Sequence, residues 1–263
     1  MESEHNPFRP PEAAIEPPAE PSADSQLLAE PRACPAGHGL SWIGQGWQLF
    51  KLRFLMWIAM LIVFGAVFMT IAVLPFIGIL ANLAFPLFFG GWMIACERVH
   101  REGELRFEDL FAGFQNHFGP LAITGLLYLA GMLTALMVGG LAGLLFGGSM
   151  AMMFSGDPGA SIGLGFVVGF LVYMALIVPV LMLVWFAPAL IVFHRLDPIP
   201  AIKLSFLGCL RNIPAYLVYG LVGMVLMILG LLPLLLGWLV VYPVLMCAVY
   251  ASYLDIFLGE APD

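Results

Sequence analysis

The chain has 263 residues, of which 62% are hydrophobic and 10% are charged, and its formal net charge is −7 at pH 7. Soluble domains are about half apolar, so a chain of this composition does not have enough polar groups to cover its surface in water. The composition therefore indicates a multi-pass membrane protein. The acidic balance excludes the basic footprint of a nucleic-acid-binding protein.

Residues 1–37 are rich in Pro, Glu and Ala and lack the apolar core of a signal peptide. Such a composition buries too little apolar surface to offset its chain entropy, so we expect a disordered cytoplasmic tail. Cys34 and His38 have a loose metal-like spacing, but two ligands without partners do not make a zinc site. We expect no metal or other cofactor, and we expect the 4 cysteines to be reduced thiols.

The long apolar runs predict an all-α integral membrane protein with six transmembrane helices. About 43 residues between Phe54 and Cys96 carry no charge, and they would span roughly 65 Å as a helix, twice a bilayer core of about 30 Å. The run must therefore fold back, and Pro75 and Gly78 supply the turn. The same argument applies to Ile213–Leu254. The membrane domain is expected over 38–258, followed by a short tail at 259–263, with spans near 54–74, 78–97, 121–146, 162–193, 214–232 and 236–256.

The 10 Lys and Arg residues lie in the tail, before the first span, or in the loops that follow the second and fourth spans. The opposite loops carry a single charge, Asp157. The positive-inside rule then places both termini and the charged loops in the cytoplasm.

An amphipathic stretch precedes each odd-numbered span. Before the first span, apolar residues recur in steps of three and four, which is one face of a helix, at Leu40, Ile43, Trp47, Phe50 and Phe54. Similar stretches cover 107–118 and 199–213, and the three align without gaps at Gly46, Gly113 and Gly208. This pattern indicates a threefold internal pseudo-repeat, in which an interfacial helix precedes each of three transmembrane hairpins.

An interfacial helix buries its apolar face among acyl chains and keeps its charges in water, so membrane lipids are the expected partners. Two interpretations remain open, namely simple anchoring and recognition of anionic lipid headgroups. The residues concerned are Trp42, Trp47, Lys51, Arg53, Arg106, Lys203 and Arg211. The aligned glycines, Gly46, Gly113 and Gly208, are expected to let each interfacial helix approach a neighbouring helix.

Small residues recur every four positions along the third expected span, at Gly131, Ala135, Gly139, Gly143 and Gly147. Such a ridge lets another helix backbone approach closely, and Gly165 and Gly169 on the fourth span are the expected partners. Packing within one chain and formation of a homo-oligomer are the two interpretations.

The sequence carries only weak signals for a catalytic or metal-binding site. Gly159–Gly163 fits the GxSxG pattern, but Ser161 has a helical context and not the required strand-to-helix turn. Three histidines and three acidic residues are expected on the cytoplasmic face: His100, His117, His194, Glu97, Glu104 and Asp109. They are either solvated groups or, alternatively, parts of a metal or acid/base site. The interiors of the expected spans lack ionisable side chains, which argues against proton-coupled transport.

Four segments carry a resemblance: "GLSWIGQGWQLFK", "GGWMIACERVHREGELRFEDLFAGF", "VWFAPALIVFH" and "PAIKLSFLGCLRNIPAYLVYG". They resemble a family of uncharacterised bacterial multi-pass inner-membrane proteins, the BPSS-type hypothetical transmembrane proteins. The resemblance implies a location in the bacterial inner (cytoplasmic) membrane. It brings no reaction, ligand or catalytic residue.

The leading functional hypothesis is a non-enzymatic accessory or organising protein of the inner membrane, which binds a cytoplasmic protein through its tail or charged loops. The alternative is a carrier or flippase-like protein for a lipid or another apolar molecule. A membrane-embedded enzyme is the third and weakest hypothesis.

Overall fold

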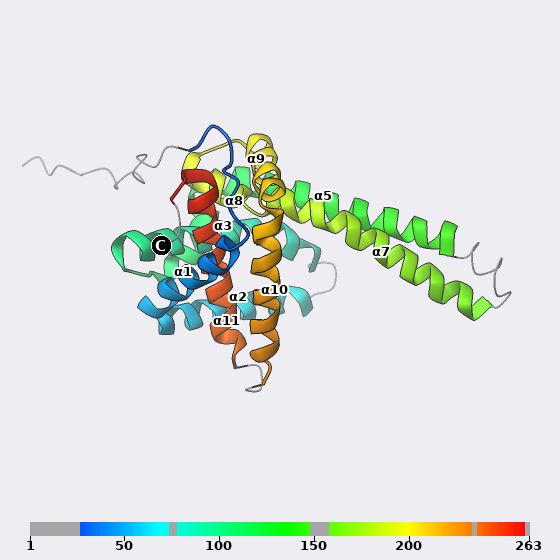
Figure 1. Ribbon diagram of the computed structural model, residues 1–263, viewed down its shortest axis with the longest axis horizontal. Helices are drawn as coiled ribbons and strands as arrows, with labels where there is room; N and C mark the ends of the chain where they lie inside the picture. The colour runs from blue at the N-terminus through cyan, green and yellow to red at the C-terminus, as the bar shows by residue number, and fades with distance from the viewer. Residues whose placement is uncertain (1–26, 74–77, 148–157, 233–235, 261–263) are drawn as a thin grey trace, which may run out of the picture.

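The computed structural model describes residues 27–73, 78–147, 158–232 and 236–260, which are mostly helical and contain no strand in those ranges (Figure 1). Three segments coincide with the expected interfacial helices: α1 (His38–Leu52), η1 (Phe107–Phe111) with α4 (Ala112–Asn116), and α9 (Pro198–Arg211). We call these three segments the elbows. Each one is followed directly by a longer apolar helix.

The longer helices follow the expected spans closely. The first pair is α2 (Phe54–Val73) and α3 (Gly78–Glu102). The second pair is α5 (Phe118–Ala142), extended by η2 (Gly143–Gly147), and α7 (Pro158–Val184), extended by α8 (Ala187–His194). The third pair is α10 (Ile213–Leu229) and α11 (Trp238–Tyr253), extended by η3 (Leu254–Leu258).

Proline residues lie at the beginning of several of these helices. Pro198 opens α9 and Pro214 lies in the first turn of α10, where the missing backbone N–H is not needed. The fourth expected span is divided into α7 and α8, with Pro188 in the first turn of α8. Asn212 separates α9 from α10, and the two helices are bent by 80°.

Within the described ranges, 4 helical stretches are long and apolar enough to cross a membrane: Phe54–Ile71, Phe118–Phe146, Gly163–His194 and Trp238–Leu258. The count rises to 5 if the bent pair Pro198–Arg211 and Ile213–Leu229 is taken as one span. α3, which ends in charged residues, and the 17-residue α10 are not among the 4. Several apolar helices of spanning length are thus present, fewer than the six expected.

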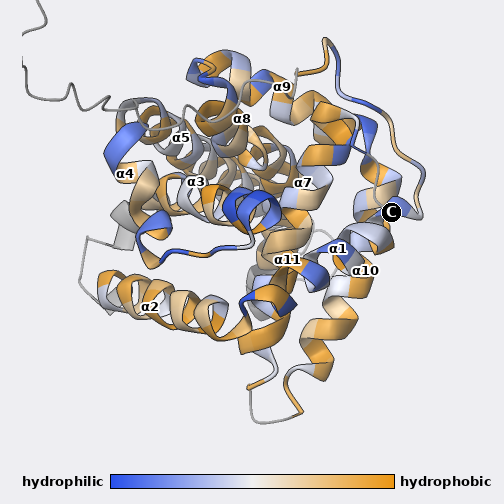
Figure 2. Ribbon diagram, turned by 90° about the vertical axis from the view of Figure 1, so that its left-hand side faces the viewer, coloured by the Kyte–Doolittle hydropathy of each residue, from blue (hydrophilic) through white to orange (hydrophobic). Residues whose placement is uncertain are grey.

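The helices divide into an inner and an outer set. In the most apolar stretch of α11 with η3, 67% of the residues are buried in the protein. In the corresponding stretch of α2, 11% are buried. α8 is buried along most of its length and packs on α3, which also contacts α11. Figure 2 shows that α2 and α10 consist mostly of hydrophobic residues. The outer helices therefore present apolar surface that a bilayer would cover.

The elbows pack in a cyclic order. η1 and α4 pack on α3, the helix just before them in the chain, and α9 packs on α7 and α8, which again precede it. Among the described residues no helix precedes α1, and it packs instead on α11, near the C-terminal end of the described chain. The contact between α1 and α11 therefore closes the arrangement from one end of the chain to the other.

Glycine makes these close approaches feasible, as expected. A Cβ on Gly46 would lie 2.4 Å from the carbonyl oxygen of Val244 in α11, and a Cβ on Gly113 would lie 2.2 Å from that of Leu87 in α3. Gly208 faces a side chain instead, since its Cβ would lie 2.5 Å from the ring of Phe257. In each elbow the aligned glycine touches another element.

The small-residue ridge packs within the chain. α5 and α7 run side by side away from the other helices (Figure 1). A Cβ on Gly139 would lie 2.8 Å from the oxygen of Gly169, and one on Gly143 would lie 2.6 Å from that of Gly165. Ala135 is buried, and Gly131 meets the side chain of Val180. Gly147 ends η2, and the following residues 148–157 lie outside the described part of the chain.

We predict that Gly46→Ala destabilises the protein by about 1–3 kcal/mol, because the new methyl group meets the backbone of α11. Gly44 lies on the same helix with nothing within 4 Å of its Cβ position, so Gly44→Ala is the matched control. Both substitutions gain the same helix propensity. Thermal unfolding in detergent measures the difference, and equal midpoints for the two variants would show that the α1–α11 contact is looser than described.

Candidate functional site

An ordered segment, residues 27–37, crosses the end of the helix bundle before α1 begins. We call it the strap. The backbone N–H of Leu28 donates to the oxygen of Phe257 over 2.9 Å, and that of Arg32 donates to the oxygen of Ile256 over 2.8 Å. The buried Asn212 side chain accepts from the N–H of Cys34 over 2.7 Å and donates to the oxygen of Arg32 over 2.8 Å.

The expectation of a disordered tail over 1–37 is therefore wrong for 27–37. A low apolar content signals disorder because it limits burial, but the strap is held by backbone bonds to distant parts of the chain, to which composition is insensitive. Residues 1–26 lie outside the described part of the chain.

The side chain of Asp255, in η3, is the centre of the site and is fully buried. Its Oδ2 lies 2.6 Å from Nδ1 of His38 and accepts from the indole N–H of Trp42 over 2.9 Å. Nη2 of Arg32 lies 3.2 Å from Oδ1, close enough for an ion pair although the angles do not make a hydrogen bond. We call these four residues, with Cys34, the Asp255 hub.

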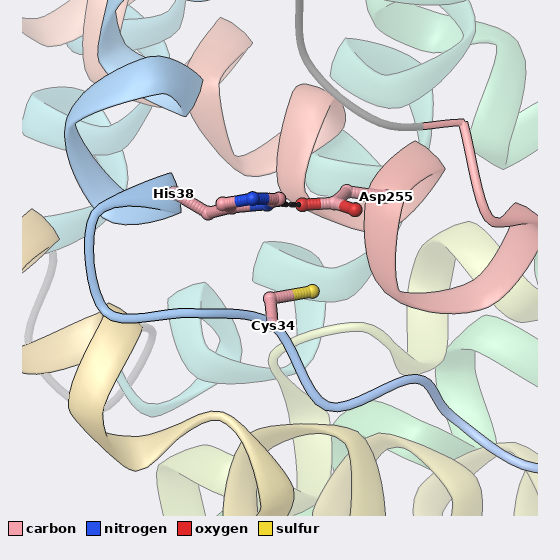
Figure 3. Close-up of side chains that lie close together, drawn as sticks. All are labelled: Cys34, His38 and Asp255. Carbon is pink, nitrogen blue, oxygen red and sulfur yellow. Dashed lines mark hydrogen bonds and ion pairs between the residues drawn. The ribbon is translucent and has the colours of Figure 1, made fainter.

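Figure 3 shows how the hub joins three parts of the chain: Cys34 comes from the strap, His38 from the start of α1, and Asp255 from the last helical turn. An isolated buried carboxylate costs several kcal/mol, and here a nearby guanidinium and two N–H groups compensate for its burial. The hub therefore holds the strap and α1 against η3.

The Sγ of Cys34, the Nδ1 of His38 and a carboxylate oxygen of Asp255 lie within 4.8 Å of one another, which is compact enough to raise the question of a metal ion. The donor atoms are already engaged. Nδ1 of His38 and the indole of Trp42 hold Oδ2, and Arg32 brings positive charge to Oδ1. Burial, and next the carboxylate of Asp255, raises the pKa of the Cys34 thiol to about 12. The arrangement fits a structural hub better than a metal centre.

A second polar cluster lies where the inner helices α3, α8 and α11 meet. Glu97 of α3 accepts from the hydroxyl of Tyr250 and from the guanidinium of Arg101. Nε2 of His194 in α8 lies 2.6 Å from the hydroxyl of Tyr253 in α11. These contacts tie the three inner helices together.

The six expected cytoplasmic groups assemble only in part. His194 and Glu97 both reach the tyrosines of α11, and the ring of His100 lies 5.9 Å from that of Tyr250. His117 lies apart, where burial and next the charge of Arg195 lower its pKa.

Asp109 pairs with Arg98 over 2.9 Å, and Glu104 lies 3.6 Å from Arg106. Among the described residues, Cys34, His38 and Asp255 are the one group of three potential metal ligands that lie close together. The side chain of Ser161 lies outside the described residues.

The expected lipid-facing residues fall into two groups. The expectation that Trp42 contacts lipid is wrong. Its side chain is buried and bonded to Asp255, so protein and not lipid covers it. Trp47 is 43% exposed, and Lys51 and Lys203 are exposed as well.

The three expected arginines have protein partners. Arg53 donates to the oxygen of Gly103 over 2.8 Å, and Arg106 lies near Glu104 and Glu108. Arg211 donates to Glu30 and to the oxygen of Pro31 in the strap. The basic residues of the elbows are thus spread over separate contacts and do not form one cluster.

An apolar cavity of about 260 Å³ lies between the three helix pairs. Residues from every pair line it: Phe68, Phe85, Phe89, Tyr128, Leu181, Val184, Trp185 and Met246. Its lining offers almost no polar group for catalysis, and it suits a hydrocarbon chain.

Helices of spanning length, apolar outer surfaces and interfacial elbows together define a multi-pass integral membrane protein. The chain is 29% identical over 250 residues to a curated protein of Burkholderia thailandensis named "probable inner membrane protein", covering 85% of this chain and 92% of that relative. The match supports an uncharacterised family of bacterial inner-membrane proteins, as the sequence segments indicated. No protein-family model and no solved structure matches the chain.

We predict that Asp255→Asn releases the strap, because the amide loses the charge that Arg32, His38 and Trp42 hold. Hydrogen bonds to a charged group contribute about 1.5–3 kcal/mol, so tryptic cleavage after Arg32 should become about 10- to 100-fold faster.

Glu30→Gln provides the control, since Glu30 is 73% exposed and its pair with Arg211 contributes little. Cleavage after Arg32 is followed by mass spectrometry. Equal cleavage rates in the wild type and Asp255→Asn would mean that the hub does not hold the strap.

Proposed function

We propose that the protein is a non-enzymatic accessory or organising protein of the bacterial inner membrane, which presents its N-terminal tail to a cytoplasmic partner from a fixed position. The observation that carries this proposal is the Asp255 hub. It holds the strap against η3, so the described chain begins, at residue 27, beside the C-terminal helix. A tail that only trailed in solvent would not need a buried ion pair to fix where it begins.

Six spans in three hairpins remain our proposal for the architecture. The cyclic packing of the elbows supports it, because each elbow, including α1, lies on the second helix of a hairpin. The 80° bend between α9 and α10 fits an interfacial helix followed by a span. In this proposal α3 and α10 complete the hairpins of α2 and α11.

The contact between the two ends of the described chain supports an even number of crossings. Leu28 is bonded to Phe257, so the strap and η3 share one side of the membrane. Four or six crossings satisfy this condition and five do not. The distribution of Lys and Arg supports the cytoplasm as that shared side.

Lipid contact through the elbows is a further part of the proposal. Trp47 and Lys51 are exposed on α1 and are suited to the interfacial zone, whereas the paired arginines favour anchoring over recognition of one headgroup. Homo-oligomerisation has less support, because the ridge on α5 packs on α7 of the same chain.

A carrier or flippase-like protein is the second candidate. The cavity of about 260 Å³ favours it, since all three helix pairs line the cavity and relative movement of the pairs would change its access. Transport of a lipid from vesicles containing the purified protein distinguishes this candidate from a static organising protein.

The orientation is tested with reporter fusions. We expect a cytoplasm-specific fluorescent reporter to be bright when it is fused before residue 1 or after residue 263. We expect a periplasm-specific phosphatase to be active when it is inserted within 148–157. Opposite signals at the two termini would contradict an even number of spans.

The organising function is tested by removing residues 1–26 and keeping the strap. We expect this variant to fold normally, and we expect crosslinking and co-purification to show the loss of at least one cytoplasmic partner. A variant in which residues 2–26 are scrambled, with the same composition, is the control for a purely charge-based interaction. Identical partner sets for the wild type and both variants would contradict the proposal.

A further inference from the structure

The central cavity of about 260 Å³ has an aromatic lining. Five of its eight described lining residues carry aromatic rings, and no charged side chain is among the eight. The rings of Phe85 and Phe89 stack with their centroids 5.7 Å apart, and the ring of Tyr128 lies 6.4 Å from that of Phe85. Aromatic rings pack favourably against other rings, so this lining favours a planar, uncharged group.

The hydroxyl of Tyr128 is the side-chain polar group of this lining that a ligand can reach. It makes no hydrogen bond with another described residue, and it retains accessible surface. The indole N–H of Trp185, in contrast, is enclosed by protein. Among the eight lining residues, Tyr128 alone carries a hydroxyl, so it marks where the polar part of a ligand would lie.

Tyr128 lies deep within an apolar helix. It is about ten residues from the start of the stretch Phe118–Phe146, or about 15 Å along the helix, which is half of a bilayer core of about 30 Å. At that depth water is scarce, so a free hydroxyl is stabilised by a ligand that offers an acceptor. A plain acyl chain fits the cavity but leaves this hydroxyl unpaired.

The volume of the cavity fits one ring and not a whole lipid. A cavity of about 150 Å³ is large enough to hold benzene, so the space here accommodates a substituted six-membered ring. Leu181 belongs to the lining and is 36% exposed, so the cavity reaches the apolar outer surface of α7. A hydrocarbon tail attached to the ring would leave on this side and lie in the bilayer.

We propose that the cavity binds the ring of a membrane quinone, with one ring carbonyl accepting from the hydroxyl of Tyr128 and the hydrocarbon tail passing Leu181. A quinone ring is planar and uncharged, and its carbonyl supplies the acceptor that Tyr128 lacks. The proposal concerns binding and includes no electron transfer. It is independent of the proposed organising function, because the strap and the preceding residues take no part in the cavity lining.

The test compares 2-decyl-1,4-benzoquinone with decylbenzene, which keeps a ring and the chain but has no carbonyl. The full-length protein is placed in lipid nanodiscs, and the excess of each compound over that in empty nanodiscs is quantified by chromatography. The wild type should bind the quinone about two- to tenfold more tightly, as expected for one net hydrogen bond. Tyr128→Phe keeps the aromatic ring and removes the hydroxyl, so it should abolish this preference.

Tyr173→Phe is the matched control, because Tyr173 lies on α7 of the same helix pair, makes no hydrogen bond with another described residue and is not among the lining residues. It should keep the preference for the quinone. Leu181→Trp should weaken the binding of both compounds, because the larger side chain narrows the cavity at its outer side. Helical content and thermal midpoint are measured for every variant, so that loss of folding is recognised.

Three results would each overturn the proposal. The first is equal binding of the two compounds by the wild type. The second is a preference that is unchanged in Tyr128→Phe or is lost in Tyr173→Phe. The third is undiminished binding of both compounds by Leu181→Trp.

Discussion

The buried carboxylate of Asp255 is the constraint on which the rest of the arrangement depends. Two elbows pack on helices that precede them directly, so chain connectivity keeps them in place. No helix precedes α1 in the part of the chain that the structure describes, and α1 packs on α11 at the other end of that part. The ion pair with Arg32 and the contacts with His38 and Trp42 supply this long-range specificity, which apolar packing between similar helices does not.

The same constraint explains the distribution of polar groups. The inner helices α3, α8 and α11 carry buried polar contacts, such as those of Glu97 with Tyr250 and of His194 with Tyr253. The outer helices carry apolar side chains that face outward. In a membrane, apolar surface gives little preference for one helix partner over another, so hydrogen bonds and close glycine contacts must select the partners. The contacts of Gly46 in α1 with α11, and of Gly139 in α5 with α7, are examples.

Much of the fold could be predicted from the sequence. The spacing of Leu40, Ile43, Trp47 and Phe50 predicted α1, the lengths of the uncharged runs predicted the helix pairs, and the aligned glycines predicted close contacts. These features are local, or they follow from the thickness of a bilayer.

The candidate site could not be predicted in the same way. The sequence places Trp42 in an amphipathic stretch, but it does not show whether lipid or protein covers its side chain. Asp255 lies at the end of the last expected span and has no local partner, so only the fold reveals that Arg32, His38 and Trp42 surround it. The strap was missed because its hydrogen bonds reach residues far away in the chain.

The central claim is that the strap and α1 close the bundle on its last helical turn, and amide hydrogen exchange in lipid nanodiscs tests it most directly. The N–H groups of Leu28, Arg32 and Cys34 are each bonded to distant residues, so we expect them to exchange as slowly as the backbone of α11. Exchange of these three amides at the rate of an unstructured chain, while α11 stays protected, would contradict the account.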